Sequence, residues 1–463
     1  MSPAQPVGEP LPGMGELPAQ AAASAPDGSE RPFSVYLHVP YCRVRCGYCD
    51  FNTYTNLTMG QGASAEDFVG TLAGELRAAR RAMDSEGLPV RAAQTVFVGG
   101  GTPTMLPATD LVSMLELVRE CFGLAADAEV TTEANPDSVD EADLAALAEG
   151  GFTRVSFGMQ SAVPHVLKVL ERTHEPARVP RVVEWARRAG LSTSLDLIYG
   201  APGESLEDWQ RSLDAVTRIG PDHVSAYALV IEEGTRMWGQ VRRGELPMPE
   251  DDDEATKYEM ADAALGQAGY EWYEISNWAR PGSECRHNQA YWLDWDWWGA
   301  GPGAHSHLGD VRLWNTKHPV AWAGQIATGH LPVAGHEVVD ARARELERVM
   351  LGIRMREGIE IPRFIGARTT AGLVADGLLD GRAGLVEHGP DAPVGGAHDQ
   401  RVADAQGAGL HEGGHDGSAP LVELGLDGHA AGVVVGVGAQ VEVGVGRVED
   451  GLQQIVDAGA QLR

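Results

Sequence analysis

Cys42-Arg43-Val44-Arg45-Cys46-Gly47-Tyr48-Cys49 places three thiols in one short loop, with the spacing C-x3-C-x2-C. Thiolates this close can converge on one metal centre, and a cubane iron–sulfur cluster normally takes four of them. Three cysteines would leave one iron open to another molecule. A structural zinc site needs a fourth Cys or His, which Asp50, Phe51 and Asn52 do not supply. The spacing therefore favours a cluster over zinc and over three incidental buried cysteines.

The composition is that of a large globular protein. The 463 residues are 43% hydrophobic, which allows a large catalytic domain and a smaller one. A net charge of −30 argues against binding nucleic acid or anionic lipid. The two other cysteines, Cys121 and Cys285, are isolated, so the chain has no disulfide framework and suits a reducing compartment. Because no signal peptide or membrane-length apolar run is visible, we expect a cytoplasmic protein that is not transmembrane.

From Arg31 onward, short apolar strands alternate with amphipathic helices. Strands are expected at 35–39, 95–98, 129–133, 154–157, 193–198 and 223–229, with one more short strand at 271–275. Helices are expected at 65–83, 110–121, 141–149, 177–189, 206–219 and 254–268. About six strand–helix units predict an α/β fold, a partial (β/α)6 TIM-like barrel with its chemistry at the carboxyl ends of the strands.

Residues that can carry chemistry lie where these predicted strands end. They are Cys42, Gly99, Glu133, Gln160, Asp196 and Ala228. A random scatter of such residues would not follow the strand ends. This placement supports a site at the mouth of a barrel, independently of any family resemblance.

Changes in composition divide the chain into four parts. Residues 1–30, rich in Pro, Ala, Gly and Ser, are expected to be a disordered leader. Residues 31–299 form the predicted core barrel. The strand–helix alternation stops near Gly299, and a charged amphipathic helix at 341–355 suggests that 300–379 is a small, mainly helical C-terminal domain.

Residues 380–463 have a different composition from the rest of the chain. This part has no Lys, Met or aromatic residue and is dominated by Gly, Ala, Val, Asp and His. We interpret it as a low-complexity tail, disordered or produced by a frameshifted reading frame, rather than as an extra domain. Its histidines are interpreted as incidental and not as metal ligands: His388, His398, His411, His415 and His429.

Three motifs together carry a family resemblance. They are Tyr36-Leu37-His38-Val39-Pro40-Tyr41, the cysteine loop, and Gly99-Gly100-Gly101-Thr102-Pro103-Thr104. In this combination, residues 31–379 resemble the radical S-adenosyl-L-methionine (SAM) superfamily, and within it the oxygen-independent coproporphyrinogen III oxidase-like family. The resemblance implies a [4Fe-4S] cluster on Cys42, Cys46 and Cys49, with its open iron chelated by the amino and carboxylate groups of SAM.

The resemblance also implies which residues hold SAM. Tyr48 resembles the aromatic residue that packs on the adenine, and Tyr36 matches a position near the methionine end. The glycine loop, with Gly100, Gly101 and Thr102, is expected to receive the amino group of SAM, since glycines let a backbone approach a ligand closely. Glu133 resembles the carboxylate that binds the ribose. From the residues alone, Glu133 could equally cap the next helix.

Four further positions match those that hold a second SAM molecule in the coproporphyrinogen dehydrogenase branch. They are Gln160, Arg172, Asp196 and Ala228. The alternative interpretation of Arg172 and Asp196 is an ion pair on the rim of the barrel.

His287-Asn288-Gln289-Ala290-Tyr291-Trp292 resembles the H-N-x-x-Y-W signature of the heme chaperone, HemW-type branch. An imidazole such as that of His287 can ligate heme iron, and aromatic side chains can cover a porphyrin face. A lone His is more often a satisfied structural residue, and the nearby tryptophans could be ordinary packing. Those tryptophans are Trp292, Trp295, Trp297 and Trp298, and the alternative heme ligands are His305, His307 and Cys285, the last of which could be only a buried thiol.

Departures from the dehydrogenase pattern favour a heme chaperone. Phe51 stands where the dehydrogenase branch has a further cysteine, a low-complexity leader replaces its ordered N-terminal segment, and the His287 signature belongs to the chaperone branch. The predicted function is to bind heme and transfer it to apo-proteins, using the cluster and SAM, without coproporphyrinogen oxidase activity. Respiratory enzymes are candidate recipients, and the electron donor is unidentified. The alternative is an oxygen-independent coproporphyrinogen III dehydrogenase, a radical SAM oxidative decarboxylase; a radical SAM enzyme with another substrate is a third candidate.

Overall fold

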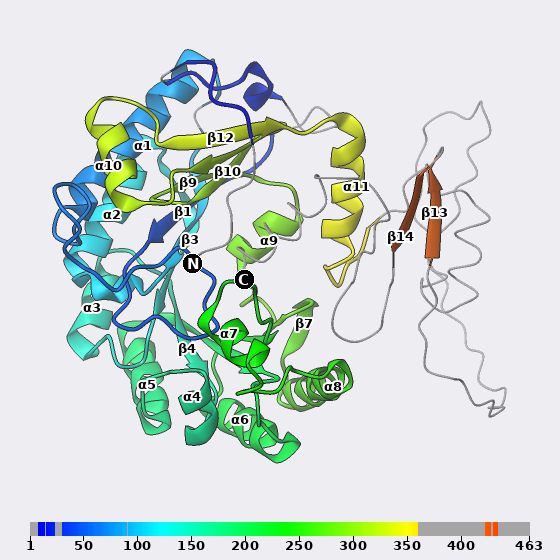
Figure 1. The fold of residues 1–463 in the computed structure, drawn as a ribbon. Helices are drawn as coiled ribbons and strands as arrows, with labels where there is room; N and C mark the ends of the chain where they lie inside the picture. The colour runs from blue at the N-terminus through cyan, green and yellow to red at the C-terminus, as the bar shows by residue number, and fades with distance from the viewer. Residues whose placement is uncertain are drawn as a thin grey trace, which may run out of the picture. The chain divides into compact units, whose positions relative to one another are not determined.

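A twelve-stranded sheet in the order β12-β11-β10-β9-β1-β2-β3-β4-β5-β6-β8-β7 organises the computed structural model (Figure 1). The structure describes residues 8–13, 15–23, 30–89, 91–359, 422–426 and 429–433. At the centre of the sheet, six neighbouring strands run parallel in chain order. They are β1 (Phe33–Val39), β2 (Ala93–Gly100), β3 (Leu124–Ala134), β4 (Arg154–Gln160), β5 (Ser192–Tyr199) and β6 (His223–Ala228).

Helical crossovers join these strands and cover their outer side (Figure 1). Along β1, Val35, Leu37 and Val39 lie in the hydrophobic core, so the alternating residues Tyr36 and His38 face the inside of the barrel. The partial (β/α)6 barrel expected from the sequence is confirmed. Its helical elements are α1 (Phe68–Ser85), η2 (Pro103–Met105), α2 (Ala108–Cys121), α3 (Glu141–Glu149), α4 (Pro164–Val169), η3 (Pro176–Arg178), α5 (Val179–Ala189), α6 (Leu206–Ile219), α7 (Arg236–Arg242) and α8 (Asp251–Gln267).

The sheet continues beyond the barrel at both edges. Next to β1, β9 (Asp296–Ala300) runs parallel, and β10 (His305–Leu308), β11 (Val311–Asn315) and β12 (Val333–Val338) follow antiparallel. At the other edge, β8 (Asn277–Ala279) and β7 (Glu271–Glu274) pair antiparallel. Between these additions, α9 (Arg286–Trp292) lies at the amino ends of the strands.

The region after residue 300 therefore differs from the mainly helical domain that we expected. Its first part adds strands to the barrel sheet, because buried residues such as Val311 and Leu313 alternate along a hairpin that continues the core. The helices α10 (Pro319–Ala327) and α11 (Ala341–Gly352) follow, the latter within the helix expected at 341–355. The remainder of the predicted domain, 360–379, lies outside the described residues.

The leader also differs from the expectation of disorder where the structure describes it. Glu9 and His336 exchange backbone hydrogen bonds of 2.9 Å, so the segment adds to the edge strand β12. The short helix η1 (Ala19–Ala22) follows, and Leu17 and Ala21 are buried in the core. The sequence did not predict this because an edge strand can pair with a segment of weak propensity through its backbone alone.

In the predicted tail, the described residues form a two-stranded antiparallel hairpin of β13 (Val422–Leu426) and β14 (His429–Val433). The rest of 380–463, with the other four histidines, lies outside the described residues. Within the part of the chain that the structure describes, no helix is both long and apolar enough to cross a membrane.

Glu75 on α1 joins the barrel to its added strands. Its buried carboxylate accepts hydrogen bonds from Gly301 N at 2.9 Å, Asn315 Nδ2 at 2.7 Å and Trp322 Nε1 at 2.7 Å. Burial raises the pKa of Glu75 to about 7, and the three donors oppose that rise. One side chain thus satisfies donors from the β9–β10 loop, β11 and α10.

We expect Glu75→Ala to lower the free energy of unfolding by about 3 kcal/mol, because three buried donors lose their acceptor at about 1–3 kcal/mol each, offset in part by removal of a buried carboxyl group. Chemical denaturation followed by tryptophan fluorescence measures this change. The control is Glu116→Ala, whose exposed side chain pairs with Arg119 on the same helix, and which should stay within about 0.5 kcal/mol of the parent. Equal stability of the two variants would contradict the assigned role of Glu75.

Candidate functional site

The loop between β1 and α1 carries the three cysteines at the carboxyl end of the parallel strands. Cys42 N donates to Tyr54 O at 3.0 Å, which closes the loop at its base. Cys49 N donates to Cys46 O at 3.2 Å, which makes the second pair of cysteines a tight turn. All three thiols are free; Cys42 is buried and the other two are half-buried. The chain therefore presents them together at the mouth of the barrel, as the sequence predicted.

The donor set fits a cluster better than a single ion. Burial raises the pKa of Cys42 to about 11 and that of Cys49 to about 12, and the neighbouring thiols add to both shifts, so the three sulfurs lie within electrostatic reach of one another. Among the described residues, no three His, Cys, Asp or Glu side chains converge tightly enough to hold one metal ion. A cubane binds each thiolate at a different iron and does not need such convergence.

The glycine loop after β2 runs directly along the cysteine loop. Gly101 N donates to Val39 O and Thr102 N donates to Tyr41 O, each at 2.8 Å. A Cβ at Gly101 would lie 2.5 Å from Tyr41 O, so only glycine fits there. The glycines are thus explained by the contact between two loops as well as by a possible ligand.

Glu133, near the end of β3, faces this glycine loop. Its Oε2 accepts from Gly100 N at 3.0 Å. Burial, and then the charge of Asp196, raise its pKa to about 8. The following helix, α3, is capped instead by Asp140, which accepts from Ala142 N at 2.8 Å. The capping alternative for Glu133 is therefore wrong, while its ribose role stays a prediction.

A relay of three polar side chains connects two of the cysteine sulfurs. Arg172 donates to Cys46 Sγ at 3.8 Å and also to the side-chain oxygen of Asn135. Asn135 Nδ2 donates to Thr102 Oγ1 at 3.1 Å, and Thr102 Oγ1 donates to Cys42 Sγ at 3.8 Å. Asn135 was not among the predicted site residues, although its position directly after a barrel strand was a usable signal.

The residues predicted for a second SAM lie at the same end of the barrel. A Cβ at Gly158 would contact both Gln160 Nε2 at 2.8 Å and an Arg172 nitrogen at 3.0 Å, so these two side chains converge. Asp196 accepts from Ser156 Oγ at 2.9 Å, and burial raises its pKa to about 6. Among the ion pairs of the described residues, none joins Arg172 to Asp196, so the rim ion pair is not formed. Ala228 ends β6.

Tyr36 lies on β1, and Tyr48 lies in the cysteine loop. Tyr36 OH lies 3.0 Å from His38 Nδ1, and His38 Nε2 lies 3.0 Å from Asn52 O. Because a carbonyl only accepts, Nε2 carries the proton and Nδ1 accepts from the Tyr36 hydroxyl. Tyr48 packs against a second apolar cluster that includes Leu170 and Ile198.

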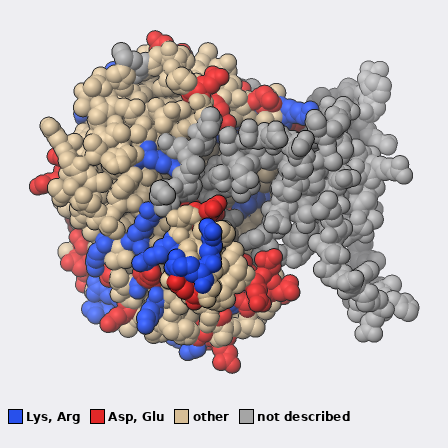
Figure 2. Space-filling view, viewed as in Figure 1, with Lys and Arg blue, Asp and Glu red and all other residues tan. Residues whose placement is uncertain are grey.

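The surface beside the cysteine loop carries charges of both signs. Met237 N of α7 donates to Gly47 O at 2.8 Å, which attaches α7 to the loop. Figure 2 shows Lys and Arg side chains gathered over the region of α7, with Asp and Glu among them. Arg43 pairs with Asp137 at 3.3 Å, and Arg243 pairs with Glu245 at 2.6 Å. Such paired charges are unlike the uniform basic field that binds nucleic acid.

His287 lies toward the opposite, amino end of the strands and is 1% exposed. Its Nδ1 is 2.7 Å from Thr95 Oγ1, its Nε2 is 3.0 Å from Tyr291 OH, and its ring stacks on Phe97. Burial lowers the pKa of His287 to about 3. Both ring nitrogens are thus occupied. The geometry matches the alternative of a satisfied structural histidine and does not support His287 as a heme ligand.

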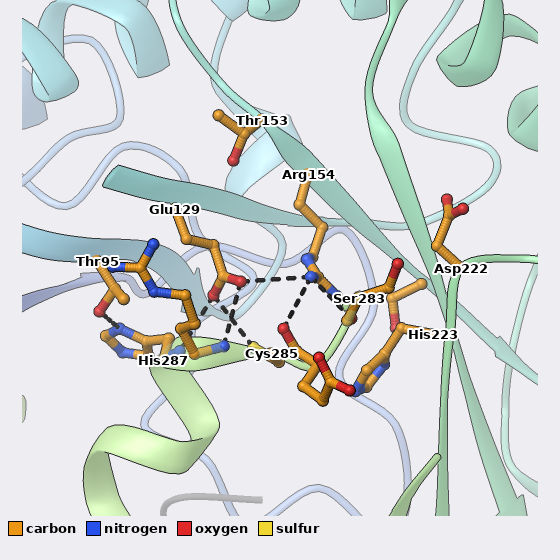
Figure 3. Close-up of polar contacts among 12 residues, drawn as sticks. Thr95, Glu129, Thr153, Arg154, Asp222, His223, Ser283, Cys285 and His287 are labelled. Atoms are coloured by element: carbon orange, nitrogen blue, oxygen red, sulfur yellow. Dashed lines mark hydrogen bonds and ion pairs between the residues drawn. The ribbon is translucent and has the colours of Figure 1, made fainter. Parts of the chain in front are cut away.

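A buried polar network holds α9 in this place (Figure 3). Glu129 accepts from His287 N at 3.1 Å, from Arg154 at 3.3 Å and from the Cys285 thiol at 3.5 Å. Arg154 also donates to Ser283 O at 3.0 Å. Burial raises the pKa of Cys285, so this residue is a buried protonated thiol and not an open ligand.

The remaining heme-site candidates are dispersed. Trp297 and Trp298 are neighbours on a strand and face opposite sides of the sheet, with Trp298 fully buried, so these two tryptophans do not share one face. His307 is buried, with Nε2 3.0 Å from Gly309 O. His305 Nε2 is also buried but has no hydrogen-bond partner. Burial, and then Lys317, lower the pKa of His305 to about 4.

Comparisons with known proteins cover most of this architecture. The family model described as Radical SAM superfamily matches residues 36–216. The heme chaperone HemW of Mycobacterium tuberculosis (strain ATCC 25618 / H37Rv) is 48% identical over 373 residues, which are 80% of this chain and 91% of that protein. The heme chaperone HemW of Bacillus subtilis (strain 168) is 31% identical over 78% of this chain and 94% of that protein.

Among solved structures, coproporphyrinogen III oxidase (HemN) from Escherichia coli, a radical SAM enzyme, is similar with a TM-score of 0.62. It is 26% identical, and the match covers 73% of this chain and 78% of that chain. The two comparisons together cover the barrel and much of the sheet added to it.

Replacing all three cysteines tests the cluster site. We expect the triple variant Cys42→Ala, Cys46→Ala, Cys49→Ala to lose bound iron and sulfide and the visible iron–sulfur absorbance after anaerobic purification, because no thiolate remains in the loop. Cys121→Ala is the control and should keep the wild-type iron content. A triple variant that retained wild-type iron would place the metal elsewhere.

The relay predicts an effect on the reduction potential. Arg172→Leu removes a cation and an N–H donor from Cys46 Sγ, which makes the reduced cluster less stable relative to the oxidised one. The midpoint potential of the cluster should therefore fall by about 60 mV, which corresponds to a tenfold change in a one-electron equilibrium constant. Redox titration monitored by electron paramagnetic resonance measures it. The control is Arg178→Leu, whose guanidinium donates to the carbonyls of Pro136 and Val139. Equal potentials in both variants would remove Arg172 from this role.

Proposed function

This chain belongs to the HemW family of heme chaperones within the radical SAM superfamily, and we propose that it binds heme and transfers it to apo-proteins. One observation carries the proposal. The similarity to the M. tuberculosis heme chaperone extends over 373 residues and 91% of that protein, well beyond the radical SAM match at 36–216. It thus includes the added strands and not only the superfamily core.

The radical SAM family implies a [4Fe-4S] cluster and SAM, and in our proposal Cys42, Cys46 and Cys49 hold the cluster. When bound, the cluster supplies the electron that cleaves the sulfonium of SAM. The free thiols at one barrel end and their shared electrostatics support this ligand set. The relay from Arg172 to Thr102 then hydrogen-bonds two of the ligand sulfurs and orients them.

For SAM, we propose the glycine loop and the barrel interior as the binding surface. Gly100, Gly101 and Thr102 present backbone against the cysteine loop, and Glu133 stands over them, with its raised pKa allowing the carboxyl group both to donate and to accept. A ribose diol has the same double capacity. Other side chains proposed to contact a SAM molecule are Tyr36, Tyr48, Gln160, Arg172, Asp196 and Ala228.

The second candidate is the oxidative decarboxylation of coproporphyrinogen III. The likeness to the E. coli coproporphyrinogen III oxidase structure, and the convergence of Gln160 and Arg172, favour it. Against it stands Phe51, at the place of the dehydrogenase branch's further cysteine. The first function transfers heme unchanged and the second converts coproporphyrinogen III to a new compound, so a heme-transfer assay and a product assay separate them.

We expect the anaerobically purified full chain to bind about one heme and to pass it to apo-myoglobin, used as a probe acceptor. The Soret band follows both steps, and titrations with and without SAM report whether SAM changes affinity. Incubation with coproporphyrinogen III, SAM and a reductant should yield no protoporphyrinogen IX. Clear formation of that product would favour the decarboxylase, and failure to bind heme would refute the chaperone proposal.

A further inference from the structure

His305 is a half-buried residue whose Nε2 atom is itself buried, and this nitrogen differs from those of the buried histidines of the described residues. Among the buried side-chain atoms there that lack a hydrogen-bond partner, His305 Nε2 is the only imidazole nitrogen. By contrast, His223 is bonded at both nitrogens, to Ser194 at 2.8 Å and to Tyr273 at 2.8 Å, as His287 is to its own partners. Leaving a buried polar atom unpaired costs about 1–3 kcal/mol. Such an atom needs an explanation, and a ligand would provide one.

The position of His305 in the barrel points to the same end as the cysteines. Gly299 pairs in register with Tyr36, which faces the barrel interior. A Cβ at Gly299 would collide with the carbonyl oxygen of His305, so the His305 backbone crosses over the inner face of β9. The preceding turn is tied to the cysteine loop, because Asn52 Nδ2 donates to Pro302 O at 2.9 Å.

His287, by comparison, is held at the far end of the same strands. Its partner Thr95 lies near the start of β2, with its side chain on the inner face. The glycine loop lies at the other end of that strand, roughly 16 Å away, because an extended chain rises about 3.3 Å per residue. A metal bound at His305 would therefore be near the cluster and SAM, whereas one bound at His287 would not.

The surroundings of His305 suit a flat, apolar and anionic ligand. Its ring centroid lies 6.2 Å from that of Trp314, and Trp297 Nε1 donates to His305 O at 3.1 Å. Aromatic rings can pack on a porphyrin face; of these two, Trp297 is half-buried, whereas Trp314 is buried. Lys317 is close enough to act electrostatically on the ring, and a cation of this kind attracts propionates. Arg312 also acts on the ring, but its guanidinium pairs with Glu337 at 3.1 Å and with Glu347. Burial and these cations keep the imidazole neutral, as iron ligation requires.

We propose that His305 Nε2, and not His287, provides the protein ligand to heme iron, in a site at the open end of the barrel beside the cysteine loop. This inference rests on the proposed heme-binding function. It would also explain how SAM and the cluster can influence heme: the cargo and the cofactors would share one barrel mouth.

The test uses the full chain with its cluster and four variants, each checked first for wild-type iron–sulfur absorbance. His305→Ala, and His305→Gln as a variant of similar size and polarity, should weaken heme binding by about tenfold or more and lose the absorption and electron paramagnetic resonance signature of a histidine-ligated heme. Added imidazole should restore that signature in His305→Ala, because the free ligand can occupy the vacated place.

Two control variants keep the result specific. His287→Ala, in the family signature, should retain the histidine-ligated heme spectrum even if the protein is less stable. His165→Ala removes an exposed imidazole on α4 and should behave as wild type. Wild-type heme affinity and spectrum in both His305 variants, or loss of ligation in a folded His287→Ala instead, would overturn this inference while leaving the chaperone proposal standing. Absence of heme binding in the wild type would refute both.

Discussion

The site depends on a backbone contact between two loops. Pairing of β1 with β2 continues past the end of the sheet, so that Gly101 and Thr102 still donate to the chain that leads into the cysteines. No side chain fits between Gly101 and Tyr41. Because main-chain pairing and not side-chain packing sets this spacing, the first thiol is held by the barrel itself. Two further contacts of the site start from the same glycine loop: Gly100 N donates to Glu133, and Thr102 Oγ1 donates to Cys42 Sγ.

Polar side chains line the inside of the barrel, and those at its amino end differ from those at its carboxyl end in their partners and their pKa values. At the amino end, Glu129 accepts from His287 N and from Arg154 and so holds α9, although Arg154 Nε and Nη1 are buried without a partner. At the carboxyl end, Glu133 and Asp196 are carboxyl groups whose pKa values burial has raised, with few neighbouring donors. Raised pKa values and incomplete pairing are typical of a site awaiting a ligand. The same strands thus hold α9 at one end and carry the candidate functional site at the other.

The strands added beside β1 connect distant sequence to this mouth. Glu75 accepts a hydrogen bond from Gly301 N, and Asn52 of the cysteine loop donates one to Pro302 O. The start of β10 is therefore tied to the cysteine loop. His287, in the family signature at 287–292, was the predicted heme ligand. Its two ring nitrogens instead lie within hydrogen-bond distance of Thr95 and Tyr291, so its role is structural. The histidine with an unpaired buried nitrogen lies in these added strands, where a short glycine-rich turn carries it over the barrel face.

Much of the fold, and the position of the cysteine loop beside the glycine loop, followed from the sequence alone. The cysteine spacing, the glycine loop and the strand ends lie in local sequence, and parallel strands necessarily bring their carboxyl ends to one edge. Only the tertiary structure decided the relay through Asn135, the partners of His287, the opposed faces of Trp297 and Trp298, and the packing of the leader. Thr95 and His287 are 192 residues apart. Which side chains meet across such a separation depends on register and on backbone pairing between distant segments, and neither leaves a periodic signal in the chain.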